Sequence, residues 1–184
     1  MMTQIIAMIW VIMVIRAVTG QSFMTFMPIF LAQKGYNLVS VGFIVSLFVL
    51  AGTVSGLLSG YLSDKIGFKR IFLTTHILMT PALLIYLYLP ENWVYMGSFI
   101  GGFFSLATMP LGVIMAQSLA PRGRSMVASL MMGLAYGLGG LASPMVGKLA
   151  DIYSIETVLF FTAFVPIISL IPILKLPRIE KDRI

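Results

Sequence analysis

Six long apolar runs constrain the fold of this chain more than any other feature of its sequence. They cover residues 4–32, 38–62, 69–89, 93–118, 125–147 and 156–174. Each run is long enough to cross the roughly 30 Å hydrocarbon core of a bilayer as a helix that rises about 1.5 Å per residue. Short stretches rich in Gly, Pro, Asn and charged residues separate the runs. The pattern therefore predicts an all-α integral membrane protein with six transmembrane helices.

Composition excludes a water-soluble fold. Hydrophobic residues make up 59% of the 184 residues and charged residues 10%, and the mean hydropathy is +1.03, whereas a soluble surface needs far more charge. The length leaves room for about six spans and no separate soluble domain, so residues 1–184 are predicted to form a single bundle. The first run lacks the basic leader of a signal peptide and is expected to be a span. Without cysteine, a disulfide framework and a thiolate metal site are excluded, and we expect neither metal nor cofactor.

Basic residues orient the predicted bundle. Most of them follow an even-numbered span or lie in the tail 177–184: Lys65, Lys69, Arg70, Arg122, Arg124, Lys175, Arg178, Lys181 and Arg183. Only Lys34 and Lys148 lie on the opposite side, and Arg16 lies within a span. The positive-inside rule therefore predicts that both termini are cytoplasmic. The net charge of +6 is then a signal of topology, and we expect no nucleic-acid partner.

The connection between the second and third runs carries a specific spacing of glycine, acid and base. Gly60 allows close helix approach, and Gly67 permits a tight turn. Asp64 can accept hydrogen bonds from backbone N–H groups at a helix start or pair with a guanidinium. Lys69 and Arg70 can hold the turn at the anionic cytoplasmic leaflet. A simple positive-inside turn explains the basic pair, but the complete spacing favours a functional segment.

This segment resembles the Gly-x-x-x-Asp-x-x-Gly-x-basic-basic loop signature of the major facilitator superfamily, and every named position matches. The resemblance implies a secondary transporter. It also implies a conformational latch, which holds the cytoplasmic helix ends in one state and releases them in another. The latch residues are Gly60, Asp64, Gly67, Lys69 and Arg70.

A closer likeness lies in the runs Arg16–Gly35, Ser46–Phe48 and Gly133–Gly140. Together with the latch, they look like the C-terminal six helices of fosmidomycin-resistance-type efflux transporters. This likeness implies efflux of a drug-like molecule by an antiporter, and so drug resistance, in the inner membrane. The first six helices of that family and its long joining loop have no counterpart here. The chain is thus expected to need a second six-helix half, from another chain or a copy of itself, unless it is a non-functional fragment.

An internal repeat supports this architecture independently of the family. Gly147–Asp151 repeats the Gly-x-Leu-x-Asp pattern of Gly60–Asp64 at an offset of 87 residues, at the same place in spans four to six. Because three spans is an odd number, the second copy must insert with opposite topology. The pattern predicts a 3+3 inverted repeat, with repeats at about 1–89 and 93–176, although a chance match is the alternative.

Small residues line one face of two predicted spans. They are Gly52, Gly56 and Gly60 in span two, and Gly133, Gly137 and Gly140, followed by Pro144, in span five. Small residues at this spacing let helix backbones approach closely in lipid, and in a transporter they also allow helices to rock or bend. Plain tight packing explains them equally well. Together with Gly147 and Asp151, they are candidate packing and hinge positions.

Arg16 is the most informative single residue. It lies about 16 Å along the first span, too deep to reach either surface easily, and a charge there costs a few kcal/mol or more. We expect it to face a polar cavity and to contact an anionic or strongly polar substrate. The alternative is a structural partner on another helix, such as Gln117. Thr19 and Phe23 share the helical face of Arg16 and are further cavity candidates.

The acidic residues limit the mechanism. All six lie in loops, at span ends or in the tail, so this chain alone cannot form a proton relay through an embedded carboxylate. No metalloprotease motif or nucleophile–base pattern occurs at a plausible depth, and we predict neither enzyme activity nor catalytic residues. A six-helix structural or assembly subunit is the alternative to a transporter half. The repeat and Arg16 favour the transporter, whose partners are a small-molecule substrate, the bilayer and the second half.

Overall fold

The computed structural model describes residues 2–177, apart from the side chain of Asn92, and confirms six helices of membrane-spanning length with no strand in that range. Three spans are continuous: α1 (Met2–Gln33), α2 (Leu38–Ile66) and α3 (Phe68–Tyr88). A short turn, η1 (Glu91–Trp93), precedes the fourth span. The other spans combine shorter elements: α4 (Val94–Leu106) with α5 (Met109–Ser118), α6 (Arg124–Ser129) with η2 (Leu130–Leu134) and α7 (Ala135–Ile152), and α8 (Ile155–Thr162) with α9 (Val165–Ile168) and α10 (Leu170–Lys175). The predicted tail lies outside the described residues beyond Pro177.

Prolines explain why two of the spans are interrupted. Pro110 lies near the start of α5, Pro166 near the start of α9 and Pro172 within α10. Proline has no backbone N–H to donate to the carbonyl four residues earlier, and its ring crowds that carbonyl. The fourth span therefore breaks near its midpoint, between Leu106 and Met109.

The structure corrects the predicted ends of two helices. The apolar runs end at residues 62 and 147, but α2 continues to Ile66 and α7 to Ile152. Asp64 and Asp151 therefore lie in helical turns and not in loops. Hydropathy predicts where the lipid ends, whereas a helix keeps its backbone hydrogen bonds after it has left the apolar layer. Gly67, with a φ of 86°, alone links α2 to α3.

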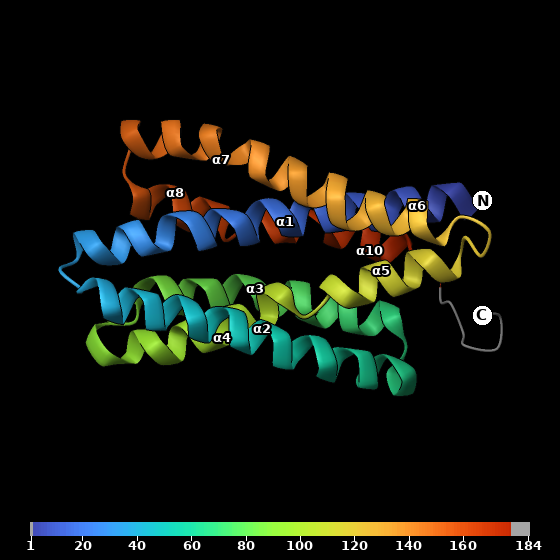
Figure 1. The fold of residues 1–184 in the computed structure, drawn as a ribbon, viewed down its shortest axis with the longest axis horizontal. Helices are drawn as coiled ribbons and strands as arrows, with labels where there is room; N and C mark the ends of the chain where they lie inside the picture. The colour runs from blue at the N-terminus through green and yellow to red at the C-terminus, as the bar shows by residue number, and fades with distance from the viewer. Residues whose placement is uncertain (1, 178–184) are drawn as a thin grey trace.

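The six spans lie antiparallel along one long axis (Figure 1). The start of α1, the α2–α3 link, the loop 119–123 and the end of α10 lie together, and we call this the basic end. The loops 34–37, 89–93 and 153–154 lie at the opposite end, called the far end below. Helix α1 packs along α7, whereas α4 packs along both α2 and α3.

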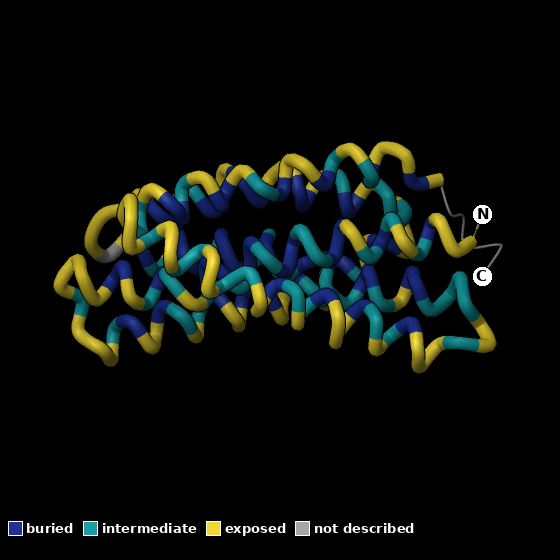
Figure 2. The backbone as a smooth tube through the Cα atoms, turned by 90° about the horizontal axis from the view of Figure 1, so that it is seen from above, coloured by how far each residue is buried: buried dark blue, intermediate teal, exposed yellow. Residues whose placement is uncertain are grey.

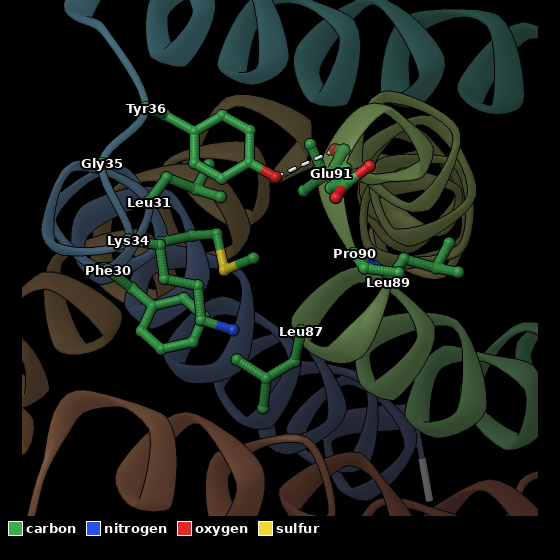
Figure 3. Close-up of a pocket in the computed structure, with 11 residues that line it drawn as sticks. Phe30, Leu31, Lys34, Gly35, Tyr36, Leu87, Leu89, Pro90 and Glu91 are labelled. Carbon is green, nitrogen blue, oxygen red and sulfur yellow. Dashed lines mark hydrogen bonds between the residues drawn. The ribbon is translucent and has the colours of Figure 1, made fainter.

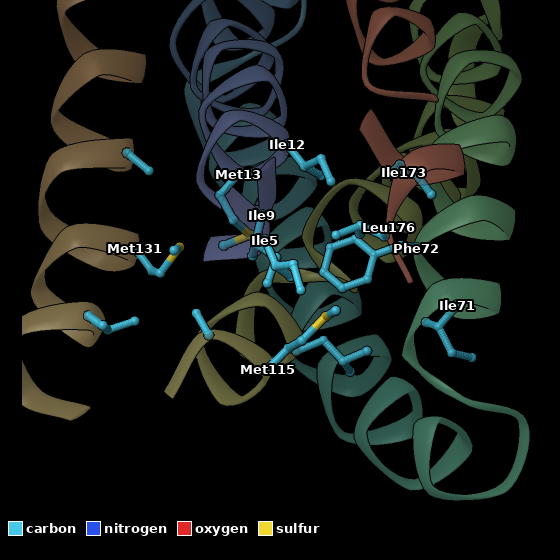
Figure 4. Packing of buried hydrophobic residues seen from close by; sticks show 14 residues of the cluster. Ile5, Ile9, Ile12, Met13, Ile71, Phe72, Met115, Met131, Ile173 and Leu176 are labelled. Carbon is cyan, nitrogen blue, oxygen red and sulfur yellow. The ribbon is translucent and has the colours of Figure 1, made fainter. Parts of the chain in front are cut away.

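Two apolar clusters fill the bundle. One lies toward the basic end and includes Ile9, Phe72 and Met115 (Figure 4), and the other lies toward the far end and includes Phe23 and Leu83. Buried polar side chains occupy the chain positions between the clusters on α1, on α3 and at the α4–α5 break: Arg16, Thr19, Ser22, Thr75, His76, Ser105 and Thr108. We call this set the polar layer. It lies at mid-span depth, where polar groups have to find partners within the protein.

The exterior of the bundle is apolar, as lipid contact requires. Exposed positions alternate with buried ones along the spans (Figure 2), and large aliphatic side chains such as Leu57, Leu141 and Ile168 are exposed. The fifth span is the least covered, with 22% of its apolar window buried against 33% to 56% in the other spans. The bundle therefore leaves α6, η2 and α7 largely open on one side.

Candidate functional site

Arg16 reaches from α1 to the break in the fourth span. The residue is 1% exposed, and its Nη1 donates a hydrogen bond of 3.1 Å to the carbonyl oxygen of Ser105. Ser105 lies in the last turn of α4, where backbone carbonyls lose their intrahelical donors before Pro110. The C-terminal end of a helix also carries a partial negative charge that favours a cation. The break in the fourth span thus provides both an acceptor and a suitable field for the guanidinium.

The same break is the packing surface for α2. Gly52 lies against the side chain of Leu106, and a Cβ on Gly56 would approach the ring of Pro110 at 3.3 Å. Ser59, one turn further along α2, donates a hydrogen bond of 2.5 Å to the carbonyl oxygen of Ala107. Gly52 and Gly56 therefore bring α2 close enough for Ser59 to satisfy a second carbonyl at the break.

Several polar atoms of Arg16 and of the break in the fourth span have no hydrogen-bond partner in the described part of the chain. Within residues 2–177, Nε and Nη2 of Arg16 and the hydroxyls of Ser105 and Thr108 are buried without a hydrogen bond. The ring of Tyr136 covers the guanidinium, with the Arg16 Cζ 5.4 Å from the ring centroid, and the Tyr136 hydroxyl donates to the sulfur of Met109 at 3.2 Å. Unpaired buried donors of this kind cost several kcal/mol in an apolar layer. The arrangement is chemically suited to an oxyanion, which accepts hydrogen bonds and neutralises the charge.

Two of the predicted cavity candidates serve packing in this bundle. The hydroxyl of Thr19 donates to the carbonyl oxygen of Ile15 in its own helix at 3.2 Å. The ring of Phe23 packs against Tyr86, with centroids 6.3 Å apart, in the cluster toward the far end. Both side chains are buried. Neither contacts the unpaired groups of Arg16 through a hydrogen bond or ring contact, so their role in a cavity stays a prediction.

The partner of Arg16 also differs from the predicted alternative. Gln117 lies toward the basic end, where its Nε2 is 3.4 Å from the carbonyl oxygen of Arg124. The residues that contact Arg16 in the structure are Ser105 and Tyr136, which the sequence analysis did not identify. One signal could have indicated them, because a proline in the middle of an apolar run frees the carbonyls of the preceding turn.

Lys69, one of the predicted latch residues, contacts the last span. Its Nζ donates to the carbonyl oxygens of Leu174 and Leu176, both at 2.6 Å, at the C-terminal end of α10. Asp64 and Arg70 lie exposed at the same basic end. A Cβ on Gly60 would meet no atom of residues 2–177 within 4 Å, so Gly60 is not a contact point in the described part of the bundle. The latch segment thus joins the start of α3 to the end of α10.

The glycines of the fifth span lie mainly on its open side. A Cβ on Gly133, Gly137 or Gly140 would meet no atom of the described residues within 4 Å, and Pro144 is exposed. We call these four residues the open glycine face. Gly139 instead packs on α1, because a Cβ there would lie 2.9 Å from the backbone of Ala17. Gly147 is in ordinary contact, with its Cβ position 3.4 Å from the ring of Phe26, and Asp151 is exposed.

Comparison with known families identifies the group to which this arrangement belongs. The family model described as Major Facilitator Superfamily matches residues 9–184. The chain belongs to the major facilitator superfamily. The predicted membership of this family is thereby confirmed, and the chain is a multi-pass protein of the cell membrane in a superfamily of transporters.

Curated relatives agree with the superfamily assignment. The chain is 34% identical over 134 residues to the fosmidomycin resistance protein of Escherichia coli. The aligned region covers 73% of this chain and 32% of that protein. It is 26% identical over 152 residues to a putative metabolite transport protein of Haemophilus influenzae, covering 80% of this chain and 37% of the relative. It is 25% identical over 131 residues to a probable galactarate/D-glucarate transporter of E. coli, covering 66% of this chain and 29% of the relative. The chain thus spans about a third of the length of these major facilitator relatives.

Proposed function

We propose that this chain is one six-helix half of a secondary transporter that exports a small anionic, drug-like molecule by alternating access. The observation that carries the proposal is Arg16, which is buried at mid-span with two unpaired nitrogen donors beside a broken helix. An oxyanion of the substrate accepts hydrogen bonds from Nε and Nη2, and the unpaired hydroxyl of Ser105 is a further donor at this site. Charge-assisted hydrogen bonds of this kind are about twice as strong as neutral ones.

The names of two relatives fit this substrate class. One is a fosmidomycin resistance protein, which supports export of a drug-like molecule. The other is a probable transporter of galactarate and D-glucarate, and both of these compounds are dicarboxylate anions. The antiport that the family resemblance implies then needs a coupling acid in the second half, because this chain has no carboxylate at mid-membrane depth.

The second six-helix half covers the open glycine face of the fifth span. Glycines on that face leave a smooth surface that another helix can approach closely, and the span is the least buried of the six. Rocking of one half against the other moves the substrate site between the two sides of the membrane. With both termini cytoplasmic in the inner membrane, the latch segment lies at the cytoplasmic end of the bundle.

Transport into inside-out membrane vesicles tests the proposal. Labelled fosmidomycin is the probe, because the E. coli relative is named for resistance to it. We expect Arg16→Gln to reduce the initial rate about tenfold or more through the loss of charge-assisted hydrogen bonds, and Arg16→Lys to retain part of it. Arg122→Gln, in an exposed loop, is the matched control and should transport normally. Equal rates in the wild-type protein and Arg16→Gln would refute the proposed substrate site.

A further inference from the structure

A second candidate site lies at the far end of the bundle, away from the polar layer. A cavity of about 450 Å³ opens between the α1–α2 loop and the link from α3 to η1 (Figure 3). Its floor is apolar and is formed by Met27, Leu31, Leu87 and Val94. Two side chains of opposite charge, Lys34 and Glu91, line opposite walls of the same cavity.

Lys34 is held against one wall by an aromatic ring. Its Nζ lies 4.3 Å from the centroid of the Phe30 ring, within the range of a cation–π interaction. Figure 3 shows the Lys34 chain running beside Phe30 into the pocket instead of away from it. The ammonium group is therefore kept at the cavity although the residue itself is exposed to water.

Glu91 is held at the opposite wall by a strained backbone. Its φ of 46° lies in the left-handed region, which costs a residue with a side chain roughly 1 kcal/mol or more. The Tyr36 hydroxyl donates a 2.9 Å hydrogen bond to the Glu91 carbonyl oxygen and so ties this turn to the α1–α2 loop across the pocket. Burial raises the pKa of Tyr36, and the charge of Glu91 raises it further, so the hydroxyl remains a donor at neutral pH. Strain that the surrounding structure maintains is typical of functional positions.

We propose that this pocket binds a zwitterion whose ammonium group lies at Glu91, whose oxyanion lies at Lys34, and whose apolar part lies on the floor. The two side chains form no ion pair with each other in the described part of the chain, so each charge is available to a ligand. A ligand with a single charge would leave one wall unmatched, and the pocket therefore selects for both charges together. This pocket lies at the far end of the bundle, whereas the transport site proposed above lies at Arg16 in mid-span. A free amino acid and an ethanolamine phospholipid headgroup share this chemistry.

Fluorescence of Trp93, which is exposed two residues after Glu91, provides a direct readout. The full chain has two tryptophans, so Trp10→Phe leaves Trp93 as the single one. This protein, in a non-ionic detergent, is titrated with L-leucine, and equilibrium dialysis with labelled leucine measures binding independently. We expect saturable binding that Glu91→Gln and Lys34→Gln each weaken at least tenfold. Leucine methyl ester, which lacks the carboxylate, and 4-methylpentanoate, which lacks the ammonium, should bind at least tenfold more weakly than leucine.

Matched variants remove the same charges elsewhere at the far end. The two variants are Lys148→Gln and Glu156→Gln. Lys148 lies on α7, and Glu156 lines a separate cavity of about 260 Å³ together with Tyr88 and Ser154. Both should bind leucine as the parent protein does, and a loss confined to Glu156→Gln would overturn the assignment to this pocket. In a second arm, native mass spectrometry counts phosphatidylethanolamine and phosphatidylglycerol retained from nanodiscs.

Selective retention of the ethanolamine lipid, lost in Glu91→Gln and Lys34→Gln, would assign the zwitterion to the membrane and support the site. Failure of both the amino acid and the lipid to bind would overturn it. Neither arm measures transport, so these results are independent of the transport proposal.

Discussion

At the scale of single residues, the backbone provides the partner that the charge of Arg16 requires. A guanidinium in the middle of a bilayer needs a carboxylate or a backbone carbonyl as its partner, and within residues 2–177 no carboxylate lies in the middle of a span. The carbonyl of Ser105 takes this role, because it lies in the last turn of α4, directly before the break in the fourth span. Only one of the guanidinium nitrogens is satisfied in this way, since Nε and Nη2 have no partner within residues 2–177. Arg16 is thus buried and still has two nitrogen atoms that can donate hydrogen bonds to a ligand.

Asp64 allows a sharper prediction at the same scale. Asp64→Asn should lower the initial transport rate at least tenfold while leaving the amount of inserted protein unchanged. The reason is that the helix end at Asp64 is exposed, where insertion tolerates a neutral amide, whereas a charge-assisted hydrogen bond of roughly 1.5 to 3 kcal/mol is lost from one conformational state. Vesicle transport and immunoblotting measure the two quantities. Lys65→Gln, at the neighbouring position, is the control, and normal transport by Asp64→Asn would contradict the latch assignment.

At the scale of the helix, close packing depends on individual glycines. A Cβ on Gly102 of α4 would collide with the backbone carbonyl of Phe48 on α2, which cannot move without separating the helices. Gly102→Ala should therefore lower the free energy of unfolding by about 1 to 3 kcal/mol, the usual cost of overpacking. Thermal denaturation in detergent measures this change. Gly42→Ala, where a Cβ would meet nothing within 4 Å, should leave stability equal or slightly raised because alanine favours the helix.

The end of α10 depends on a lysine from another helix. Lys69→Gln removes the donor to the carbonyls of Leu174 and Leu176, and we expect faster amide hydrogen exchange in α10. The loss is on the order of 1 kcal/mol, since the Lys69 side chain is only half-buried and water competes for the carbonyls. Exchange followed by mass spectrometry of peptides over 165–177 measures the effect. Lys65→Gln, whose lysine lies over the ring of Tyr61 in its own helix, should exchange as the wild-type protein does.

At the scale of the whole molecule, orientation is the first quantity to test. A cytoplasmic reporter fused after Arg183 should be active, and an external reporter inserted at Asn92 should also be active. The expectation rests on the basic residues near the α2–α3 link and the loop 119–123, which lie at the same end of the bundle as the start of α1 (Figure 1). The reverse activity pattern would place the latch on the outside and contradict its assignment.

The number of helices in the functional particle is the second quantity at this scale. The chain has no cysteine, so Gly137→Cys places a unique thiol on the open glycine face. If a second six-helix half covers this face, a short bifunctional reagent in native membranes should crosslink Gly137→Cys into a species with at least twelve helices. Ile77→Cys, exposed on α3, is the control and should remain uncrosslinked. A transport-competent monomer of 20.2 kDa would contradict the prediction.

The sequence by itself determined the number of spans and most of their ends, because insertion into a bilayer depends on a sum of local transfer energies. It also predicted the latch segment, whose residues are close together in the chain and lie on both sides of the turn at Gly67. The depth of Arg16 followed from the same local count. The hydrogen-bond partner of Arg16 could not be predicted in this way, because Gln117 and Ser105 both lie on the fourth span. The rotation of that span and its break before Pro110 decide that Ser105 is the partner.

Tertiary structure alone decided which faces meet. Gly52 and Gly137 have similar sequence contexts, yet one packs against Leu106 and the other is open. The far-end pocket likewise combines Lys34 and Glu91, which belong to different loops. In lipid, apolar residues gain little from leaving the surrounding solvent, so hydrophobicity does not select the contacting faces. They are selected by van der Waals fit and interhelical hydrogen bonds between residues far apart in the chain, which no local pattern in the sequence records.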